Sequence, residues 1–167
     1  KKYKTSSKLC EAILKETTID IAIVTTNSSV AAIEKQLIPI LKASIPVLTT
    51  CEELSYPWKT FPAEAERIHA LATAHHVAVL STGVNPGFLM DFLPSVSTAI
   101  CQRVSSIKVI RFQDASIRRL PFQQKIGVGL STTEFAARVE KKLLRHVGLV
   151  ESIYFIAHQL GWVLDAV

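Results

Sequence analysis

The 167-residue chain is 49% hydrophobic and 20% charged, a composition that supports a folded core and excludes a disordered protein. No apolar run reaches the roughly 18 to 20 residues that span a bilayer, and Lys1-Lys2-Tyr3-Lys4 is not followed by the apolar region of a signal peptide, so we expect a cytoplasmic protein with no membrane partner. The net charge of +5 arises after residue 100, because residues 1–100 carry nine basic and nine acidic side chains, whereas residues 101–167 carry ten and five.

The basic excess does not indicate a nucleic-acid partner, because the basic residues lack interleaved aromatics and form no DNA-binding motif. A small anionic ligand fits the charge better. Cys10, Cys51 and Cys101 are odd in number and widely spaced, which argues against a disulfide framework and a structural zinc site. His75 and His76 diverge by roughly 100° on a helix, so they do not ligate one metal readily. We predict no metal site.

The first hundred residues alternate apolar strands with helices. A lysine-rich stretch, interpreted as a helix, comes first. The apolar pattern then predicts strands over 19–24, 46–50 and 77–81 and helices over 30–43, 62–75 and 88–100. Strand 19–24 is apolar apart from Asp20, as expected for a parallel strand covered on both faces. Strands and helices in alternation with short connections indicate a parallel α/β sheet with right-handed crossovers.

Each predicted strand ends in polar, turn-forming sequence. The carboxyl ends of parallel strands meet at one edge of a sheet, where ligands bind in such folds. Strand ends are polar in many proteins, so any one of these segments alone is ordinary surface. Together they predict a cleft lined by Thr25-Thr26-Asn27-Ser28, Thr49-Thr50-Cys51-Glu52-Glu53 and Ser81-Thr82-Gly83-Val84-Asn85.

The third strand leads into a Gly-x-Asn-Pro-Gly turn. Gly83 and Gly87 allow close approach of the backbone, and Pro86 fixes φ and removes one N–H. With the N–H groups of the next helix pointing into the turn, a small anionic or polar ligand fits there. The alternative is a connection whose glycines and proline only set its geometry.

The pattern changes near Gln102, which divides the chain into predicted domains over 1–101 and 102–167. Residues 104–112 form an apolar strand, and 113–125 are polar without a helical period. Ser131-Thr132-Thr133-Glu134 is a capping box that opens a helix to about Leu144. A last helix spans 150–160 and ends at Gly161.

The polar segment 111–129 is the densest group of candidate binding residues. Arg118 and Arg119 suit a carboxylate or phosphate, because guanidinium binds such groups with two hydrogen bonds, and Gln123 and Gly127 can add donors. Asp114 is the candidate to hold an amino group or to orient one of the arginines, and Lys125 is the candidate proton donor. An ordinary solvated loop is the alternative. His146 between two helices is a second candidate acid or base, or a helix-end residue that contacts carbonyls.

Three ordered motifs resemble the dihydrodipicolinate reductase-like superfamily, and within it the branch that contains 2,4-diaminopentanoate dehydrogenase. The motifs are Gly83-Val84-Asn85-Pro86-Gly87-Phe88-Leu89-Met90-Asp91, the segment from Asp114 to Gly127, and His146-Val147-Gly148-Leu149-Val150-Glu151-Ser152. The resemblance implies an α/β Rossmann-type nucleotide domain followed by an α+β substrate and oligomerisation domain. It further implies NAD or NADP as cofactor, a small amino-acid substrate and a homo-oligomer.

The resemblance also assigns roles to individual residues. It places the cofactor's ribose and nicotinamide near Thr25, Thr26, Asn27, Thr50 and Glu52, and the nicotinamide edge at Gly83, Asn85, Pro86 and Gly87. It places Asp114, Arg118, Arg119, Gln123 and Lys125 toward the substrate.

Two departures from the superfamily narrow the predicted function. Arg111, Phe112 and Gln113 stand where dihydrodipicolinate reductases carry a His-His motif, which disfavours a cyclic imine reductase. No glycine precedes Gly83, so the phosphate-binding glycine loop and the first strand of a Rossmann domain are missing. We therefore interpret the sequence as part of an NAD(P)-dependent oxidoreductase acting at an amine or imine carbon, with a non-catalytic ligand-binding domain as the alternative from another class.

Overall fold

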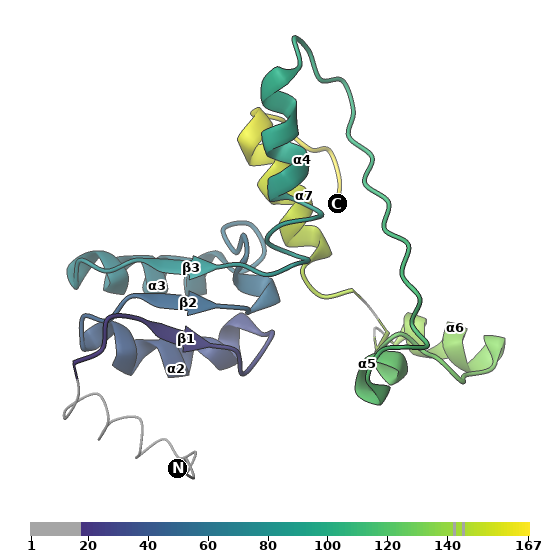
Figure 1. Cartoon of the computed structure of the whole chain (residues 1–167), viewed down its shortest axis with the longest axis horizontal. Helices are drawn as coiled ribbons and strands as arrows, with labels where there is room; N and C mark the ends of the chain where they lie inside the picture. Colours follow the sequence, from purple (N-terminus) through teal and green to yellow (C-terminus); the bar gives the residue numbers. More distant parts are fainter. Residues whose placement is uncertain (1–17, 142, 145) are drawn as a thin grey trace. The chain divides into compact units, whose positions relative to one another are not determined.

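A computed structural model describes residues 18–141, 143–144 and 146–167 and divides the chain into two compact units (Figure 1). The first unit contains the chain up to Arg103 together with Gly148–Val167, and the second is Val104–Val147. The predicted lysine-rich helix lies outside the described residues. The predicted domains over 1–101 and 102–167 are defined by function. The two units are defined by compactness, so they do not test that prediction.

The first unit is built on a parallel three-stranded sheet of order β1-β2-β3. The strands are β1 (Ala22–Val24), β2 (Val47–Thr49) and β3 (Val79–Ser81). They are joined by α2 (Val30–Lys42) and α3 (Pro62–Ala74), and the 3-10 turn η1 (Glu52–Leu54) follows β2. The predicted α/β class and the Rossmann-like parallel sheet are thereby confirmed.

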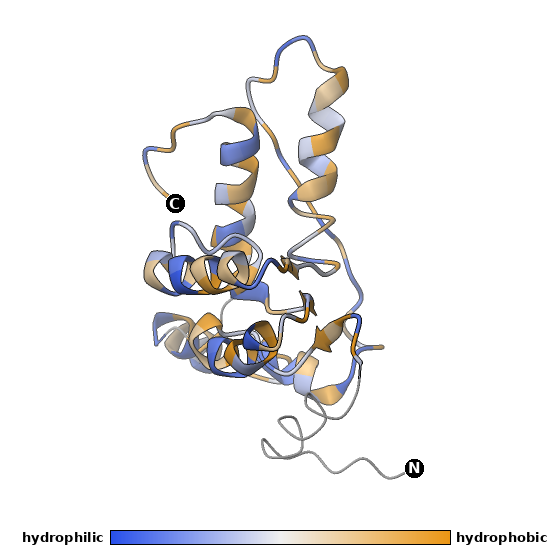
Figure 2. Cartoon of the chain, turned by 90° about the vertical axis from the view of Figure 1, so that its left-hand side faces the viewer, coloured by the Kyte–Doolittle hydropathy of each residue, from blue (hydrophilic) through white to orange (hydrophobic). Residues whose placement is uncertain are grey.

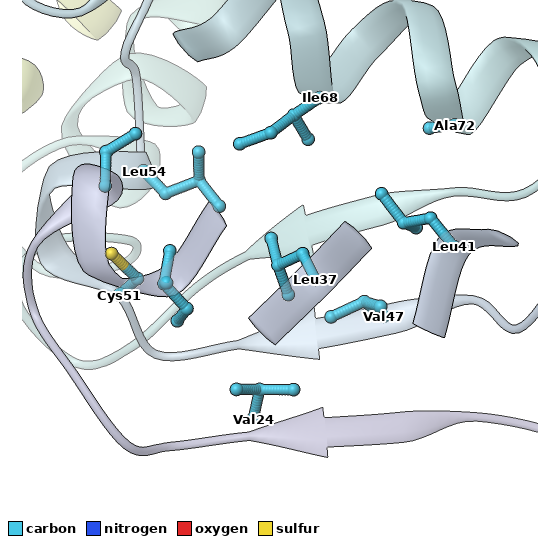
Figure 3. Packing of buried hydrophobic residues seen from close by; sticks show 10 residues of the cluster. Val24, Leu37, Leu41, Val47, Cys51, Leu54, Ile68 and Ala72 are labelled. Atoms are coloured by element: carbon cyan, nitrogen blue, oxygen red, sulfur yellow. The ribbon is translucent and has the colours of Figure 1, made fainter. Parts of the chain in front are cut away.

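Helices α2 and α3 pack their apolar residues on one face of the sheet. Leu37 and Leu41 of α2 are fully buried, and they meet Val47 of β2 and Ile68 of α3 (Figure 3). The spacing of Ile33, Leu37 and Leu41 is the helical repeat that brings all three side chains to the core. This core fixes the strands that lead to the candidate site.

The opposite face of the sheet carries exposed apolar side chains, which corrects the prediction that strand 19–24 is covered on both faces. Ile23 is 67% exposed and Leu80 is 58% exposed. The cause is topological, because consecutive right-handed crossovers in the order β1-β2-β3 put α2 and α3 on the same face. Figure 2 shows the strands among the hydrophobic parts of the chain.

The rest of the first unit contains α4 (Phe92–Ser97), the 3-10 turn η2 (Thr98–Ile100) and α7 (Leu149–Leu160), and α4 and α7 pack side by side (Figure 1). The predicted helix over 88–100 begins only at Phe92. Pro94 explains the difference, because its ring clashes with a helical carbonyl four residues earlier, at Met90. Gly161 ends α7 in the left-handed conformation, as predicted.

The second unit differs most from prediction. Residues 104–112 are extended but form no strand, since the described residues of this unit include no strand to pair with them. The segment predicted to lack helix contains α5 (Leu120–Lys125), which has Pro121 in its first turn. Helix α6 (Thr132–Glu140) begins at the predicted capping box, where Ser131 and Glu134 bond reciprocally. It ends four residues before the predicted Leu144.

Across the described part of the chain, every helix is too short or too polar to cross a membrane.

The buried face of α2 leads to a stability prediction. Leu37→Ala should lower the free energy of unfolding by about 2–5 kcal/mol, because it leaves a cavity at a fully buried position. Ile38→Ala, at the neighbouring position that is 37% exposed, is the matched control and should cost clearly less. Urea unfolding of both variants measures the difference, and equal losses would contradict the packing.

Candidate functional site

The polar strand ends lie together at one edge of the sheet, as the sequence predicts. The register pairs Val24 with Thr49 and Thr49 with Ser81, so the three strands end level with one another. Hydrogen bonds continue beyond the strands, from the Thr50 N–H to the Val24 carbonyl at 3.3 Å and from the Thr82 N–H to the Thr49 carbonyl at 2.9 Å. The cofactor candidates after β1, β2 and β3 therefore occupy one edge.

The segment after β1 is held by its own side chains. The Oδ1 of Asn27 accepts the Ser29 N–H at 2.8 Å, and the Thr26 hydroxyl donates to Gln36 of α2 at 2.6 Å. Thr25, Thr26, Asn27 and Thr50 are all exposed at this edge. The predicted residues present hydroxyl and amide groups to the surface there.

A buried carboxylate occupies the start of α2. Glu53, only 7% exposed, accepts the Val30 N–H at 3.0 Å, while its own N–H donates to the Ser28 carbonyl at 3.2 Å. The first N–H of α2 therefore bonds a side chain of this protein, and the negative charge of Glu53 disfavours a phosphate at that helix end.

The Gly-x-Asn-Pro-Gly turn requires both glycines. Gly87 has φ of +110°, and a Cβ there would lie 2.4 Å from the Gly83 nitrogen. A Cβ at Gly83 would lie 3.0 Å from the Pro86 carbonyl oxygen. The turn folds back on itself so closely that side chains at these two positions do not fit.

Asp91 joins this turn to two helices. Its carboxylate accepts the Gly87 N–H at 2.7 Å, the Phe92 N–H at 2.6 Å and the Ser152 hydroxyl at 2.8 Å. Asp91 and Ser152 are both 2% exposed. One buried carboxylate thus links the turn, the first residue of α4 and the first turns of α7.

This arrangement corrects the prediction that helix N–H groups after the turn are available to a ligand. The N–H of Phe92, the first residue of α4, bonds Asp91 instead. An anion at this point would meet a carboxylate, so a neutral or cationic group fits better.

A second contact between turn and α7 is made by Gly148. It has φ of +87°, and a Cβ there would lie 2.5 Å from Cγ of Pro86 and 3.3 Å from Cβ of Glu52. The predicted cofactor residues Pro86 and Glu52 are therefore packed against the third sequence motif. Pro86 is buried, whereas Asn85 and Glu52 are half-buried beside it.

A groove of about 450 Å³ opens beside the turn. Gly83, Gly87 and Asp91 line it, with hydroxyl groups from Ser55 and Thr82. Much of the remaining wall is aromatic and comes from Phe88, Phe92 and Phe155. The lining therefore combines apolar rings with a buried carboxyl group, and the Ser55 hydroxyl itself donates to the Glu52 carbonyl at 2.8 Å.

The predicted substrate residues belong to the second unit, and two of them stabilise its loop. Asp114 accepts the Ser116 N–H at 2.8 Å, and hydrogen bonds from Ser116 hold the pKa of this carboxyl below its usual range. Gln123 donates to the carbonyls of Ser116 at 3.0 Å and Arg118 at 2.8 Å. These bonds close residues 114–123 into a compact exposed loop.

The basic candidates lie around that loop. The guanidinium of Arg118 stacks on Phe122 at 4.5 Å, Arg119 precedes α5, and Lys125 ends it. Gly127 has φ of +84°, and a Cβ there would lie 2.7 Å from Phe135. Gly127 thus has a packing role beside its predicted one.

The structure therefore gathers the predicted residues in two sets, the cofactor set in the first unit and the substrate set in the second. Sequence analysis placed Glu53 at the predicted cleft and Asp91, Gly148 and Ser152 within two of the motifs, but it missed the structural roles of all four residues. Asp91 offered one signal, because aspartate directly before an apolar helix is a preferred N-cap. Among the described residues there is no group of three or more side chains able to hold a metal ion.

Comparison with known proteins supports the branch that the motifs indicate. Residues 88–167 match the family model for the 2,4-diaminopentanoate dehydrogenase C-terminal domain. The chain is 34% identical over 157 residues to the 2,4-diaminopentanoate dehydrogenase of Acetoanaerobium sticklandii. The aligned residues cover 93% of this chain and 44% of that protein. The resemblance to this branch is confirmed.

A solved amine dehydrogenase from Mycobacterium smegmatis has the same fold, with a TM-score of 0.70 and 20% identity over 93% of this chain and 46% of that one. The chain thus spans less than half the length of either protein.

The contact between Gly148 and Pro86 gives a testable prediction. Gly148→Ala should lower the free energy of unfolding by about 1–3 kcal/mol more than Gly161→Ala. Gly148 and Gly161 flank α7, and both have positive φ, so alanine strains the backbone at either position. A Cβ at Gly161 meets nothing within 4 Å, so Gly161→Ala is a control that has the backbone strain without the clash. Chemical denaturation of both variants compares them, and equal losses would show that Pro86 yields to the added methyl group.

Proposed function

We propose that this chain forms part of an NAD(P)-dependent dehydrogenase that oxidises the amine-bearing carbon of a small amino acid such as 2,4-diaminopentanoate. The observation that carries the proposal is the Gly83–Gly87 turn beside an aromatic groove at the carboxyl edge of a parallel sheet. Support comes from the relative named 2,4-diaminopentanoate dehydrogenase and from the matching C-terminal domain model. We also propose that the protein is cytoplasmic and forms a homo-oligomer.

The groove fits the nicotinamide end of the cofactor. Phe88, Phe92 and Phe155 offer apolar walls to its ring, and the hydroxyls of Ser55 and Thr82 suit its carboxamide. Thr25, Thr26, Asn27 and Thr50 offer polar groups for the ribose at the same edge. When bound, the nicotinamide accepts the hydride of the substrate.

The start of α2 does not fit the pyrophosphate, because Glu53 bonds its first N–H there. We therefore assign this part of the sheet edge to the nicotinamide end only.

The second unit would bind and orient the substrate. Stacking on Phe122 uses the flat face of the Arg118 guanidinium, and the N–H groups lie in the plane of that group, where they can bind a carboxylate. Arg119 would add a second positive charge, and Gln123 and Gly127 would shape the loop. Asp114 would hold a substrate ammonium, and Lys125 would carry the proton that leaves the amine.

Cofactor binding by the intact protein tests the proposal. NADH or NADPH should bind with a shift or quenching of the nicotinamide fluorescence, because the ring moves from water into an aromatic groove. Titration of each cofactor measures its affinity. If neither form binds, the dehydrogenase assignment is wrong and a non-catalytic domain becomes the better reading.

The role of Arg118 is tested by kinetics. Arg118→Ala should raise KM for 2,4-diaminopentanoate on the order of tenfold, as expected when a hydrogen bond between two charged groups is lost. The KM for the corresponding diamine without the carboxylate should not change. Arg138→Ala, which removes an exposed arginine of α6, is the control. An unchanged KM for both substrates would remove Arg118 from the site.

A further inference from the structure

Asp91 combines burial with charge in an unusual way for a loop residue. Among the described residues, the carboxylate of Asp91 accepts hydrogen bonds from two backbone N–H groups and from the Ser152 hydroxyl. A carboxylate, which only accepts hydrogen bonds, matches this set of donors. Since all these donors are neutral, they stabilise the negative charge without cancelling it.

That charge lies in the wall of the aromatic groove. Asp91 lines the groove although it is 2% exposed, and this burial keeps water from screening its charge fully. A cation bound in the groove would be attracted, whereas an anion would be repelled. The oxidised nicotinamide ring is a cation, and the reduced ring is neutral.

The same carboxylate also fixes the shape of the groove. Ser152, 61 residues further along the chain, anchors Asp91 to α7, and Gly148 at the start of that helix packs on Pro86. The turn is therefore held from two points of one helix. Among the described residues, the Ser152 hydroxyl is the only group of α7 that donates a hydrogen bond to Asp91.

We propose that Asp91 is a positioning residue that holds the Gly83–Gly87 turn against α7 and, through its charge, favours the oxidised over the reduced nicotinamide. The proposal rests on the proposed function, because it takes the groove to hold that ring. It adds a redox preference, which neither the motifs nor the relatives assign.

Two substitutions separate the charge from the anchor. Asp91→Asn removes the charge and places an amide where the carboxylate accepts hydrogen bonds, so it should raise the Kd of the oxidised cofactor on the order of tenfold and that of the reduced cofactor by a smaller factor. Ser152→Ala keeps the charge and should raise both Kd values by the same small factor. Ser97→Ala is the control, because its hydroxyl donates only to the Leu93 carbonyl within α4.

Binding is measured on the intact protein by calorimetric titration with each redox form, and circular dichroism confirms that each variant is folded. If Asp91→Asn does not fold, Ser152→Ala and amide hydrogen exchange of the wild type still test the anchor. The Gly87 and Phe92 amides should exchange faster in Ser152→Ala than in Ser97→Ala.

The outcomes are distinguishable. Folded Asp91→Asn protein with unchanged affinities, or with both affinities reduced by one factor, overturns the redox preference while the proposed function stands. Unchanged exchange in Ser152→Ala overturns the anchor. Wild-type protein that binds neither redox form overturns the proposed function and this assignment together.

Discussion

The buried carboxylate of Asp91 is the constraint on which the candidate site depends. A carboxyl group at 2% exposure is tolerated only when hydrogen-bond partners surround it, and here the donors come from the turn, from α4 and from α7. This requirement joins two segments that the sequence separates by the whole second unit. The return of the chain at Gly148–Val167 to the first unit is thus part of how the turn is built.

A second carboxylate, Glu53, acts similarly at the other end of the same sheet edge. It bonds the first N–H of α2, as Asp91 bonds the first N–H of α4. The first N–H of α2 and the first N–H of α4 are therefore each bonded by a carboxylate of the protein itself. A carboxylate at these points disfavours phosphate, which supports our proposal that this edge takes the nicotinamide end of a dinucleotide.

Elements that depend on local periodicity can be predicted from the sequence. Elements and contacts that depend on residues far away in the chain cannot. The strands, α2 and α3 follow from apolar spacing, and the capping box at Ser131 and Glu134 predicts the start of α6. The extended segment 104–112 has the residues of a strand, but pairing requires a neighbour that the described part of its unit does not provide. The bond between Asp91 and Ser152 spans 61 residues, and no local pattern reveals it.

The substrate set differs physically from the cofactor set, because its described hydrogen bonds are local ones. Within the described residues of 104–147 no side chain is buried, so hydrogen bonds from Gln123 and the stacking of Arg118 on Phe122 fix the loop without a core beneath it. Exposed guanidinium groups are screened by water and bind a carboxylate weakly by charge alone. Geometry must then supply the selectivity, and the planar guanidinium of Arg118, which lies over the Phe122 ring, carries its N–H groups in one plane. A lysine at position 118 would keep the charge and lose that plane.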